Sequence, residues 1–313
     1  MPVASSPTLL LDTASLYYRS YFALPESMTA PDGSPHNAIR GLLTTITRLV
    51  ERTGATQLAC CWDVSWRPDW RVALLPSYKT HRLASDDDDG EAEPDTLGPQ
   101  ISAIAEILDA LGLCRPGVRH FEADDVIASI AAQADGPIFV ITGDRDLVQV
   151  VDDDRQVRVV LTANGGMEGW PVLDSAAVLQ RFGVTPEQYV DLAVLRGDPS
   201  DGIPGVPGIG AKTAAALLTT YGSIDAVLDG AATAPTTKPL TPRIAETLLT
   251  HADLIARSQQ VATAVTDLSV PCEPATLAIP QSPADPAALT RLAQEWGVER
   301  FAKLPKATQS ATA

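Results

Sequence analysis

Carboxylates gather at two structural boundaries within residues 121–146, which read FEADDVIASIAAQADGPIFVITGDRD. Glu122, Asp124 and Asp125 come just before apolar residues at helical spacing, so we expect them in the first turn of a helix, where the dipole favours acids. Asp144 and Asp146 follow a short apolar run, residues 138–142, that predicts a buried strand. Each feature alone has a structural explanation, as dipole complementarity or as a helix cap.

Two further apolar runs also end at an aspartate. Residues 8–11 lead to Asp12 and residues 58–62 lead to Asp63, with a helical pattern over residues 38–50 between them. This alternation predicts a parallel, doubly wound α/β sheet, in which sites form outside the carboxyl ends of the strands. The acids would then meet at one edge, where like charges repel unless cations or protons neutralise them. Oxygen ligands of this kind suit Mg²⁺ or Mn²⁺.

Residues 70–82 combine Arg71, Lys79 and Arg82 with Tyr78, a mixture that can bind phosphate and stack on bases. The same pattern also fits an amphipathic helix with a solvated basic face. The acidic run that follows, up to Pro99, predicts a mobile, solvated loop.

A glycine-rich stretch, residues 198–213, leads into the helical pattern AAALLTTYG. Small residues before a helix start let a phosphate approach backbone N–H groups at the positive end of the dipole. The stretch is not a Walker A loop, because Ala211 separates Gly210 from Lys212 and no strand leads in. A helix-hairpin-helix turn that grips a DNA backbone fits better than a plain helix connection, since Asp198 and Asp201 stand just ahead of it.

Composition indicates a chain able to bury a substantial core, with 313 residues of which 45% are hydrophobic. The net charge of −16 argues at face value against a nucleic-acid partner, but two groups of seven and nine acids account for the excess. No apolar stretch reaches the ~18–20 residues of a membrane span and no signal pattern opens the chain, so we expect a soluble, intracellular protein. Four cysteines without CxxC spacing predict free thiols.

Taken together, these motifs resemble the structure-specific 5′ nuclease family: flap endonucleases, phage 5′ exonucleases and the 5′-nuclease domain of bacterial DNA polymerase I. The resemblance covers nearly the whole chain and rests on LLLDTASLYYRSYFALP, DGSPHNAIRG, RVALLPSYKTHR, FEADDVIASI, VITGDRDLVQV and GDPSDGIPGVPGIGAKTA, in that order. It implies a stand-alone nuclease with a PIN-like parallel-sheet core, a helical arch and a C-terminal all-α subdomain of the helix-hairpin-helix type.

The resemblance implies that two or more Mg²⁺ or Mn²⁺ ions bind at nine carboxylates: Asp12, Asp63, Glu122, Asp124, Asp125, Asp144, Asp146, Asp198 and Asp201. It assigns Lys79, Arg82 and Arg19 to catalysis, as the side chains that hold the scissile phosphate. Predicted DNA contacts are Tyr78, Arg71, Gly205, Gly208, Gly210, Lys212 and Thr213, and relatives suggest K⁺ at the hairpin turn.

The chain departs from the family pattern in three places. Gly202 stands where the family usually has Asn, which is expected to loosen the loop. His36 and Asn37 replace the more usual Thr-Gly. The acidic run lies in the arch, where a threaded single strand would prefer basic residues.

We predict a nuclease core over residues 1–185 that includes an arch at about 71–100. A helix-hairpin-helix subdomain is expected over residues 186–270, a C-terminal segment packed on the core over 271–305, and a disordered tail over 306–313.

The predicted function is a divalent-metal-dependent 5′-3′ exonuclease and 5′ flap endonuclease acting in DNA replication and repair. Expected partners are DNA with a 5′ flap, nick or 5′ end, with RNA primer strands as further candidates and no membrane, for a monomer in the cytoplasm at the nucleoid. A non-catalytic DNA-structure-binding protein would have lost carboxylates, and none is lost. A PIN-type ribonuclease usually lacks the hairpin, and a phosphatase using Asp144 and Asp146 would leave the other acids unexplained.

Overall fold

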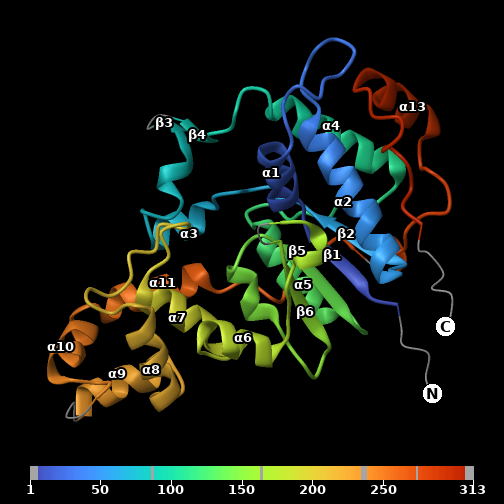
Figure 1. Cartoon of the computed structure of the whole chain (residues 1–313). Coiled ribbons are helices and arrows are strands. Elements are labelled where there is room, and N and C mark those ends of the chain that lie inside the picture. The colour runs from blue at the N-terminus through green and yellow to red at the C-terminus, as the bar shows by residue number, and fades with distance from the viewer. Residues whose placement is uncertain (1–5, 86–87, 163–164, 234–237, 273, 307–313) are drawn as a thin grey trace, which may run out of the picture.

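A five-stranded sheet in the order β2-β1-β5-β6-β7 forms the centre of the molecule (Figure 1). The computed structural model describes residues 6–85, 88–162, 165–233, 238–272 and 274–306. All strand pairs are parallel except the pair formed by the short edge strand β7, which is antiparallel to β6. The strands are β1 (Thr8–Asp12), β2 (Gln57–Cys61), β5 (Ile138–Thr142), β6 (Val157–Leu161) and β7 (Val172–Leu173).

Both faces of the sheet are covered, because alternate residues of each strand point to opposite sides. Leu9 and Cys60 belong to one hydrophobic cluster, whereas Leu10 and Cys61 belong to the other. The first face packs against α1 (Thr13–Ala23), α2 (Asn37–Thr53), α4 (Gly98–Leu111) and α13 (Pro286–Glu295). The second packs against α5 (Ala123–Gln133), the 3₁₀ turn Asp146–Val150 and α6 (Ser175–Phe182). The doubly wound α/β fold is therefore confirmed, with one antiparallel edge strand that was not expected.

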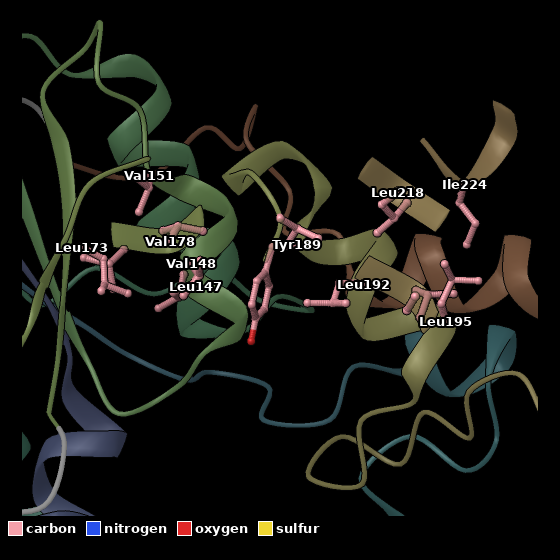
Figure 2. Close-up of a cluster of buried hydrophobic side chains, with 14 of the residues drawn as sticks. Leu147, Val148, Val151, Leu173, Val178, Tyr189, Leu192, Leu195, Leu218 and Ile224 are labelled. Atoms are coloured by element: carbon pink, nitrogen blue, oxygen red, sulfur yellow. The ribbon is translucent and has the colours of Figure 1, made fainter. Parts of the chain in front are cut away.

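A group of helices extends the second face away from the sheet (Figure 1). It contains α7 (Tyr189–Arg196), α8 (Ala211–Tyr221), α9 (Ile224–Thr233), α10 (Pro242–Thr250) and α11 (Ala252–Ala262). Figure 2 shows one hydrophobic cluster running from Leu147 beside the sheet through Tyr189 to Leu218 and Ile224. The sheet and the helices therefore share a continuous core. None of the described helices is long and apolar enough to cross a membrane.

The segment after β2 differs from the predicted helical arch and mobile loop. It holds α3 (Asp69–Leu74), a 3₁₀ turn (Thr80–Arg82) and an antiparallel hairpin of β3 (Leu83–Ser85) and β4 (Asp88–Glu91), which stands away from the sheet (Figure 1). Pro76 and four consecutive aspartates oppose one continuous helix, since proline removes an amide donor and like charges at helical spacing repel. Residues 86–87, and the predicted tail beyond Lys306, lie outside the described residues.

The chain returns to the sheet after α11. The short helix α12 (Pro274–Leu277) follows, and Ala278 then forms a bridge with Gln57 at the start of β2. The C-terminal residues thus pack against the core, where α13 contacts α4.

Candidate active site

Three parallel strands deliver acids to the same edge of the sheet, as their order predicts. Asp12 ends β1, and its carboxylate accepts a hydrogen bond of 2.6 Å from the hydroxyl of Thr142 at the end of β5. Asp63 follows β2 and accepts the first backbone N–H of α5 at 2.8 Å. Asp144 follows β5 and accepts the backbone N–H two residues further on at 2.9 Å. Local hydrogen bonds at the strand ends therefore hold these three carboxylates at one edge of the sheet.

These acids line a cleft of about 770 Å³ that also receives basic side chains. The cleft brings together ten of the predicted catalytic and metal-binding residues, which are Asp12, Arg19, Asp63, Lys79, Arg82, Glu122, Asp124, Asp144, Asp146 and Asp198. Acids and cations from segments distant in sequence thus face one cavity.

The nine predicted carboxylates divide into two groups by the charges beside them. Four are ion-paired: Glu122 with Lys79 and Arg71, Asp125 with Arg71, Asp198 with Arg196, and Asp201 with Arg82. Within the described part of the chain, the other five have no ion-pair partner: Asp12, Asp63, Asp124, Asp144 and Asp146. Most of the uncompensated negative charge of the cleft therefore lies on these five, which we call the unpaired acids.

Burial and mutual repulsion make four of these acids, Asp12, Asp63, Asp124 and Asp146, resist ionisation. Burial, with the charges of Asp63 and Asp144, raises the pKa of Asp12 to about 7. Burial also raises the pKa of Asp63, and burial together with the Asp144 charge raises the pKa of Asp124 and of Asp146 well above the ordinary value. A bound cation would relieve the same repulsion that otherwise favours the protonated carboxyls.

The chemistry of the unpaired acids fits a hard divalent cation, because all their donor atoms are carboxylate oxygens. Among the described residues, however, no three acids, histidines or cysteines converge closely enough to hold an ion as they stand. The predicted cluster is therefore a set of separate acids around one cleft. Binding an ion would require these side chains to move closer together.

Glu122 connects the basic residues of segment 70–82 with the acids of the cleft. It caps the N-terminus of α5, and Lys79 binds one of its carboxylate oxygens. The Tyr78 hydroxyl and the Arg71 guanidinium donate to the other oxygen at 2.6 and 2.5 Å. Burial alone would lower the pKa of Lys79, but the Glu122 carboxylate raises it well above the ordinary value. Lys79 therefore stays charged beside the cleft.

The structure contradicts the predicted DNA contacts of Arg71 and Tyr78. Their side chains are buried, with 3% and 2% of each residue exposed. Arg71 donates to both oxygens of Asp125 at 2.7 and 2.8 Å and to the carbonyl of Val261 at 3.0 Å. Asp125 is likewise fully buried and does not line the cleft. Successive side chains of an α-helix point in directions about 100° apart, so Asp124 faces the cleft while Asp125 faces Arg71.

The other two predicted catalytic cations also line the cleft and come from different parts of the chain. Arg82 donates to the carbonyl of Ser200 at 2.8 Å and pairs with Asp201 at 3.4 Å. Arg19 donates to two backbone carbonyls of the loop after β6 at 2.8 and 2.9 Å and lies 5.5 Å from the ring of Trp170. Both guanidiniums are thus held near the cleft by loop carbonyls.

Ser15 and Arg196 are two of the cleft residues that were not predicted from the sequence. Ser15 accepts the backbone N–H of Gly143 at 2.6 Å and donates its own backbone N–H to Asp12, so it connects two of the strand ends. Its position three residues after Asp12 is the usual partner position of a helix cap, which was a readable signal. Arg196 pairs with Asp198 at 3.2 Å and had no such signal.

The glycine-rich turn connects α7 to α8 and presents most of its predicted residues at the surface. Gly208, Gly210 and Lys212 are exposed and Thr213 is half-buried. Gly205 is buried instead, and an added Cβ there would lie 2.5 Å from the backbone nitrogen of Gly197. Gly205 thus allows two chain segments to pack closely, while the others remain available to a ligand.

Gly202 makes a tight contact rather than the loosened loop expected from the sequence. Its φ is +70°, and an added Cβ would lie 2.1 Å from the carbonyl oxygen of Ser77 and 3.3 Å from the backbone nitrogen of Lys79. The Ser77 hydroxyl donates to the carbonyl of Gly202 at 2.8 Å. A residue without a side chain therefore lets this loop pack against the segment that carries Lys79.

We expect Gly202→Ala to displace Lys79 and to lower stability by about 1–3 kcal/mol, because overpacking adds to the strain of a positive φ. Gly208→Ala is the matched control, since Gly208 has a φ of +80° but nothing within 4 Å of an added Cβ. Urea unfolding of both variants separates the cost of overpacking against Ser77 from the cost of backbone strain at a positive φ. Equal losses in the two variants would show that the Ser77 contact contributes nothing.

Comparison with known proteins assigns the chain to a family. Residues 7–183 match the model of the 5′-3′ exonuclease N-terminal resolvase-like domain, and residues 184–285 match that of the 5′-3′ exonuclease C-terminal SAM fold. A 5′-3′ exonuclease of Streptomyces coelicolor is 48% identical, over 93% of this chain and 96% of that protein. One of Mycobacterium tuberculosis is 41% identical, over 96% and 98%.

Similarity extends to larger proteins and to solved structures. DNA polymerase I of Mycobacterium tuberculosis is 35% identical over 87% of this chain and 29% of its own length. A phage T5 flap endonuclease, solved with DNA and metal ions, matches with a TM-score of 0.63 at 20% identity, over 83% of this chain and 89% of that one. The Rad2 catalytic core with DNA substrate matches with a TM-score of 0.60 at 16% identity, over 94% and 89%. The two domain models and the two full-length relatives together show that this chain belongs to the 5′-3′ exonuclease family.

Proposed function

We propose that this protein uses Mg²⁺ or Mn²⁺ to hydrolyse phosphodiester bonds in DNA, as a 5′-3′ exonuclease and a 5′ flap endonuclease. The observation that carries the proposal is the cleft itself, where five unpaired acids face Lys79, Arg82 and Arg19. Acids that repel one another are stabilised by bound cations, and the basic side chains of the same cleft attract a phosphodiester. The names of the full-length relatives and the metal ions in the phage T5 structure support this proposal.

Each group in the cleft has a distinct role in this proposal. Asp12, Asp63, Asp124, Asp144 and Asp146 would hold the metal ions, and bound ions of this kind stabilise phosphate charge and lower the pKa of a water molecule. Lys79 is charged beside the cleft and, with Arg82 and Arg19, would orient the phosphate and stabilise its developing charge. Glu122 positions Lys79, and Arg71 and Tyr78 position Glu122 in turn.

The α7–α8 turn is the proposed contact with the DNA backbone. Gly208 and Gly210 leave the N-terminal amides of α8 accessible, and the exposed Lys212 adds a charge. We propose that K⁺ binds at this turn, as the resemblance to the family implies. In this assignment residues 1–185 form the nuclease core, with residues 71–100 as its arch segment. Residues 186–270 bind duplex DNA, and residues 271–305 pack on the core.

The proposed substrates are DNA with a 5′ flap, a nick or a 5′ end, together with RNA primer strands. The Rad2 core and the phage T5 enzyme were solved with DNA, which supports a DNA partner. We propose that the protein acts as a monomer in the cytoplasm, at the nucleoid.

The decisive experiment uses end-labelled DNA with a 5′ flap, a nicked duplex and a single-stranded RNA, each with Mg²⁺ or Mn²⁺. Wild type is compared with the Asp144→Asn/Asp146→Asn double variant. We expect wild type alone to cut near the flap junction and at the nick. Binding of DNA without metal-dependent cutting would favour a non-catalytic DNA-binding protein. Cutting of the RNA alone would favour a ribonuclease.

The acidic hairpin of β3 and β4 is expected to affect how fast the protein cleaves a flap relative to a nick. Glu91 lines the cleft beside Lys79 and Arg82, where its charge opposes an incoming strand. We expect Glu91→Gln to raise flap cleavage relative to nick cleavage by about fivefold, the effect of one nearby charge worth about 1 kcal/mol. Glu93→Gln is the matched control, since Glu93 lies two residues away and does not line the cleft. The ratio of kcat/KM on the two substrates measures the effect, and an equal change in both variants would rule out a local role for Glu91.

A further inference from the structure

Two cysteines that are 158 residues apart in the sequence lie in contact beside β2, the edge strand of the sheet. The sulfur atoms of Cys114 and Cys272 lie 3.5 Å apart, and both residues are half-buried. The remaining two cysteines, Cys60 and Cys61, are fully buried on opposite faces of β2. All four were predicted to be free thiols, but only Cys114 and Cys272 have sulfur atoms that are both in contact and partly accessible.

The backbone holds Cys114 in a fixed position. Cys114 follows α4 on an extended segment that runs beside β2, where its carbonyl accepts the backbone N–H of Cys60 at 2.8 Å. Two residues later, the carbonyl of Pro116 accepts the backbone N–H of Trp62 at 2.9 Å. Cys114 is thus part of the sheet edge that leads to Asp63.

Cys272 belongs to a different part of the molecule. It ends the segment that returns from α11, which is held against α5 by two hydrogen bonds of Ser129, to the carbonyl of Val265 at 2.8 Å and from the backbone N–H of Leu268 at 3.2 Å. The backbone N–H of Cys272 then donates to the carbonyl of Val270 at 2.7 Å. The pair therefore spans the junction between the sheet and the chain leaving the helical region.

The environment of the pair makes one sulfur reactive. The Cys114 thiol donates a hydrogen bond to Cys272, which lowers the pKa of Cys272 to about 7 although burial opposes the shift. Burial instead raises the pKa of Cys60 to about 12 and that of Cys61 well above its ordinary value. Since the thiolate is the reactive form, oxidation is directed to the accessible pair.

We propose that Cys114 and Cys272 are a site of reversible thiol oxidation, at which hydroperoxides produce an intramolecular disulfide. The Cys272 thiolate attacks a peroxide oxygen, the O–O bond breaks, and with hydrogen peroxide the leaving oxygen departs as water after protonation. The hydrogen bond to Cys272 raises the pKa of Cys114, so Cys114 reacts as the thiol: its sulfur attacks the sulfenic sulfur, its proton passes to the leaving hydroxyl, and a second water departs. In the net reaction, two thiols and one H₂O₂ give one disulfide and two waters. A dithiol reductant then reduces the disulfide back to the two thiols.

The disulfide would close a long loop across the junction between the sheet and the returning segment. Cross-links of long loops constrain the unfolded chain most, so the oxidised protein should unfold at a higher temperature. The sulfurs need to approach by only about 1.5 Å to reach bonding distance. The active-site cleft does not include either cysteine, so the modification acts on stability and not on the reacting groups.

The test uses the full-length protein treated with a small excess of hydrogen peroxide and then with an alkylating reagent. Peptide mapping by mass spectrometry under non-reducing conditions should recover one cross-linked pair, Cys114 with Cys272, while Cys60 and Cys61 remain free. The midpoint of thermal unfolding should rise by roughly 5 °C on oxidation and fall back after reduction with dithiothreitol. Cys114→Ser and Cys272→Ser should each abolish both the cross-link and the rise.

Three results would overturn the proposal. One is a wild-type protein that keeps four alkylatable thiols after peroxide treatment. Another is a cross-link that joins a different pair, such as Cys61 with Cys272. The third is a rise in unfolding temperature that persists in Cys114→Ser. The wild-type peptide map decides the matter even if a serine variant fails to fold, and none of these readouts depends on nuclease activity.

Discussion

We expect Asp146→Asn to cleave a 5′-flap DNA at least about 10³-fold more slowly than wild type, while its affinity for the DNA changes little. The substitution conserves size and removes the charge of one of the five unpaired acids. Burial and the charge of Asp144 already raise the pKa of Asp146 well above the ordinary value, so a cation gains much by binding there. A 10³-fold loss corresponds to about 4 kcal/mol of transition-state stabilisation.

Single-turnover cleavage in saturating Mg²⁺ measures the rate, and fluorescence anisotropy with Ca²⁺ in place of Mg²⁺ measures DNA affinity. Asp154→Asn is the control, because Asp154 is exposed, does not line the cleft and loses the same charge. Near-wild-type turnover of Asp146→Asn would refute the role assigned to this carboxylate. A parallel loss of DNA affinity would show that Asp146 acts in binding rather than in the chemical step.

The second large effect concerns stability. We expect Arg71→Met to lower the free energy of unfolding by about 3–5 kcal/mol, since it leaves the buried Asp125 without a cation and Glu122 with Lys79 alone. Arg71 is 3% exposed and pairs with Glu122 and Asp125, and it also donates to the carbonyl of Val261 just before the end of α11. One guanidinium therefore joins α3, α5 and α11.

Urea unfolding followed by circular dichroism measures this loss, with the slope of the transition as a check on two-state behaviour. Arg52→Met, at an exposed position of α2, is the control and should change stability by no more than about 0.5 kcal/mol. If Arg71→Met stays as stable as wild type but binds DNA more weakly, the original prediction of a DNA contact is restored. A loss of stability with DNA affinity unchanged below the transition supports the buried role.

Several features of the site could be predicted because they depend on local pattern and on strand order. Short apolar runs that end at Asp12, Asp63 and Asp144 predict strands, and parallel strands bring their carboxyl ends to one edge whatever the side-chain details. The position of the acids at the start of α5 was predicted by helix periodicity. These signals lie within about ten residues of sequence, so no long-range packing was needed to read them.

Other features depend on contacts that no local pattern encodes. The pairing of Arg71 with Asp125 and of Lys79 with Glu122 joins residues more than 40 positions apart, and the same basic pattern fitted a DNA-binding face equally well. Gly202 was expected to loosen its loop because the crowding comes from Ser77, 125 residues earlier. The hairpin of β3 and β4 stands where the sequence predicted a loop. Its strands are held by backbone hydrogen bonds between them, which the acidic composition of the segment does not reveal.

The sequence by itself determined the α/β class, the family and the edge of the sheet at which the acids gather. These properties follow from the period of the apolar residues and from the types of residue at the strand ends. Only the tertiary structure decided which acids are neutralised by the chain's own cations, which side chains are buried, and which two of the four cysteines meet. The physical reason is that charge pairing and burial act across a few ångströms of space, and folding, not sequence distance, sets which side chains come that close.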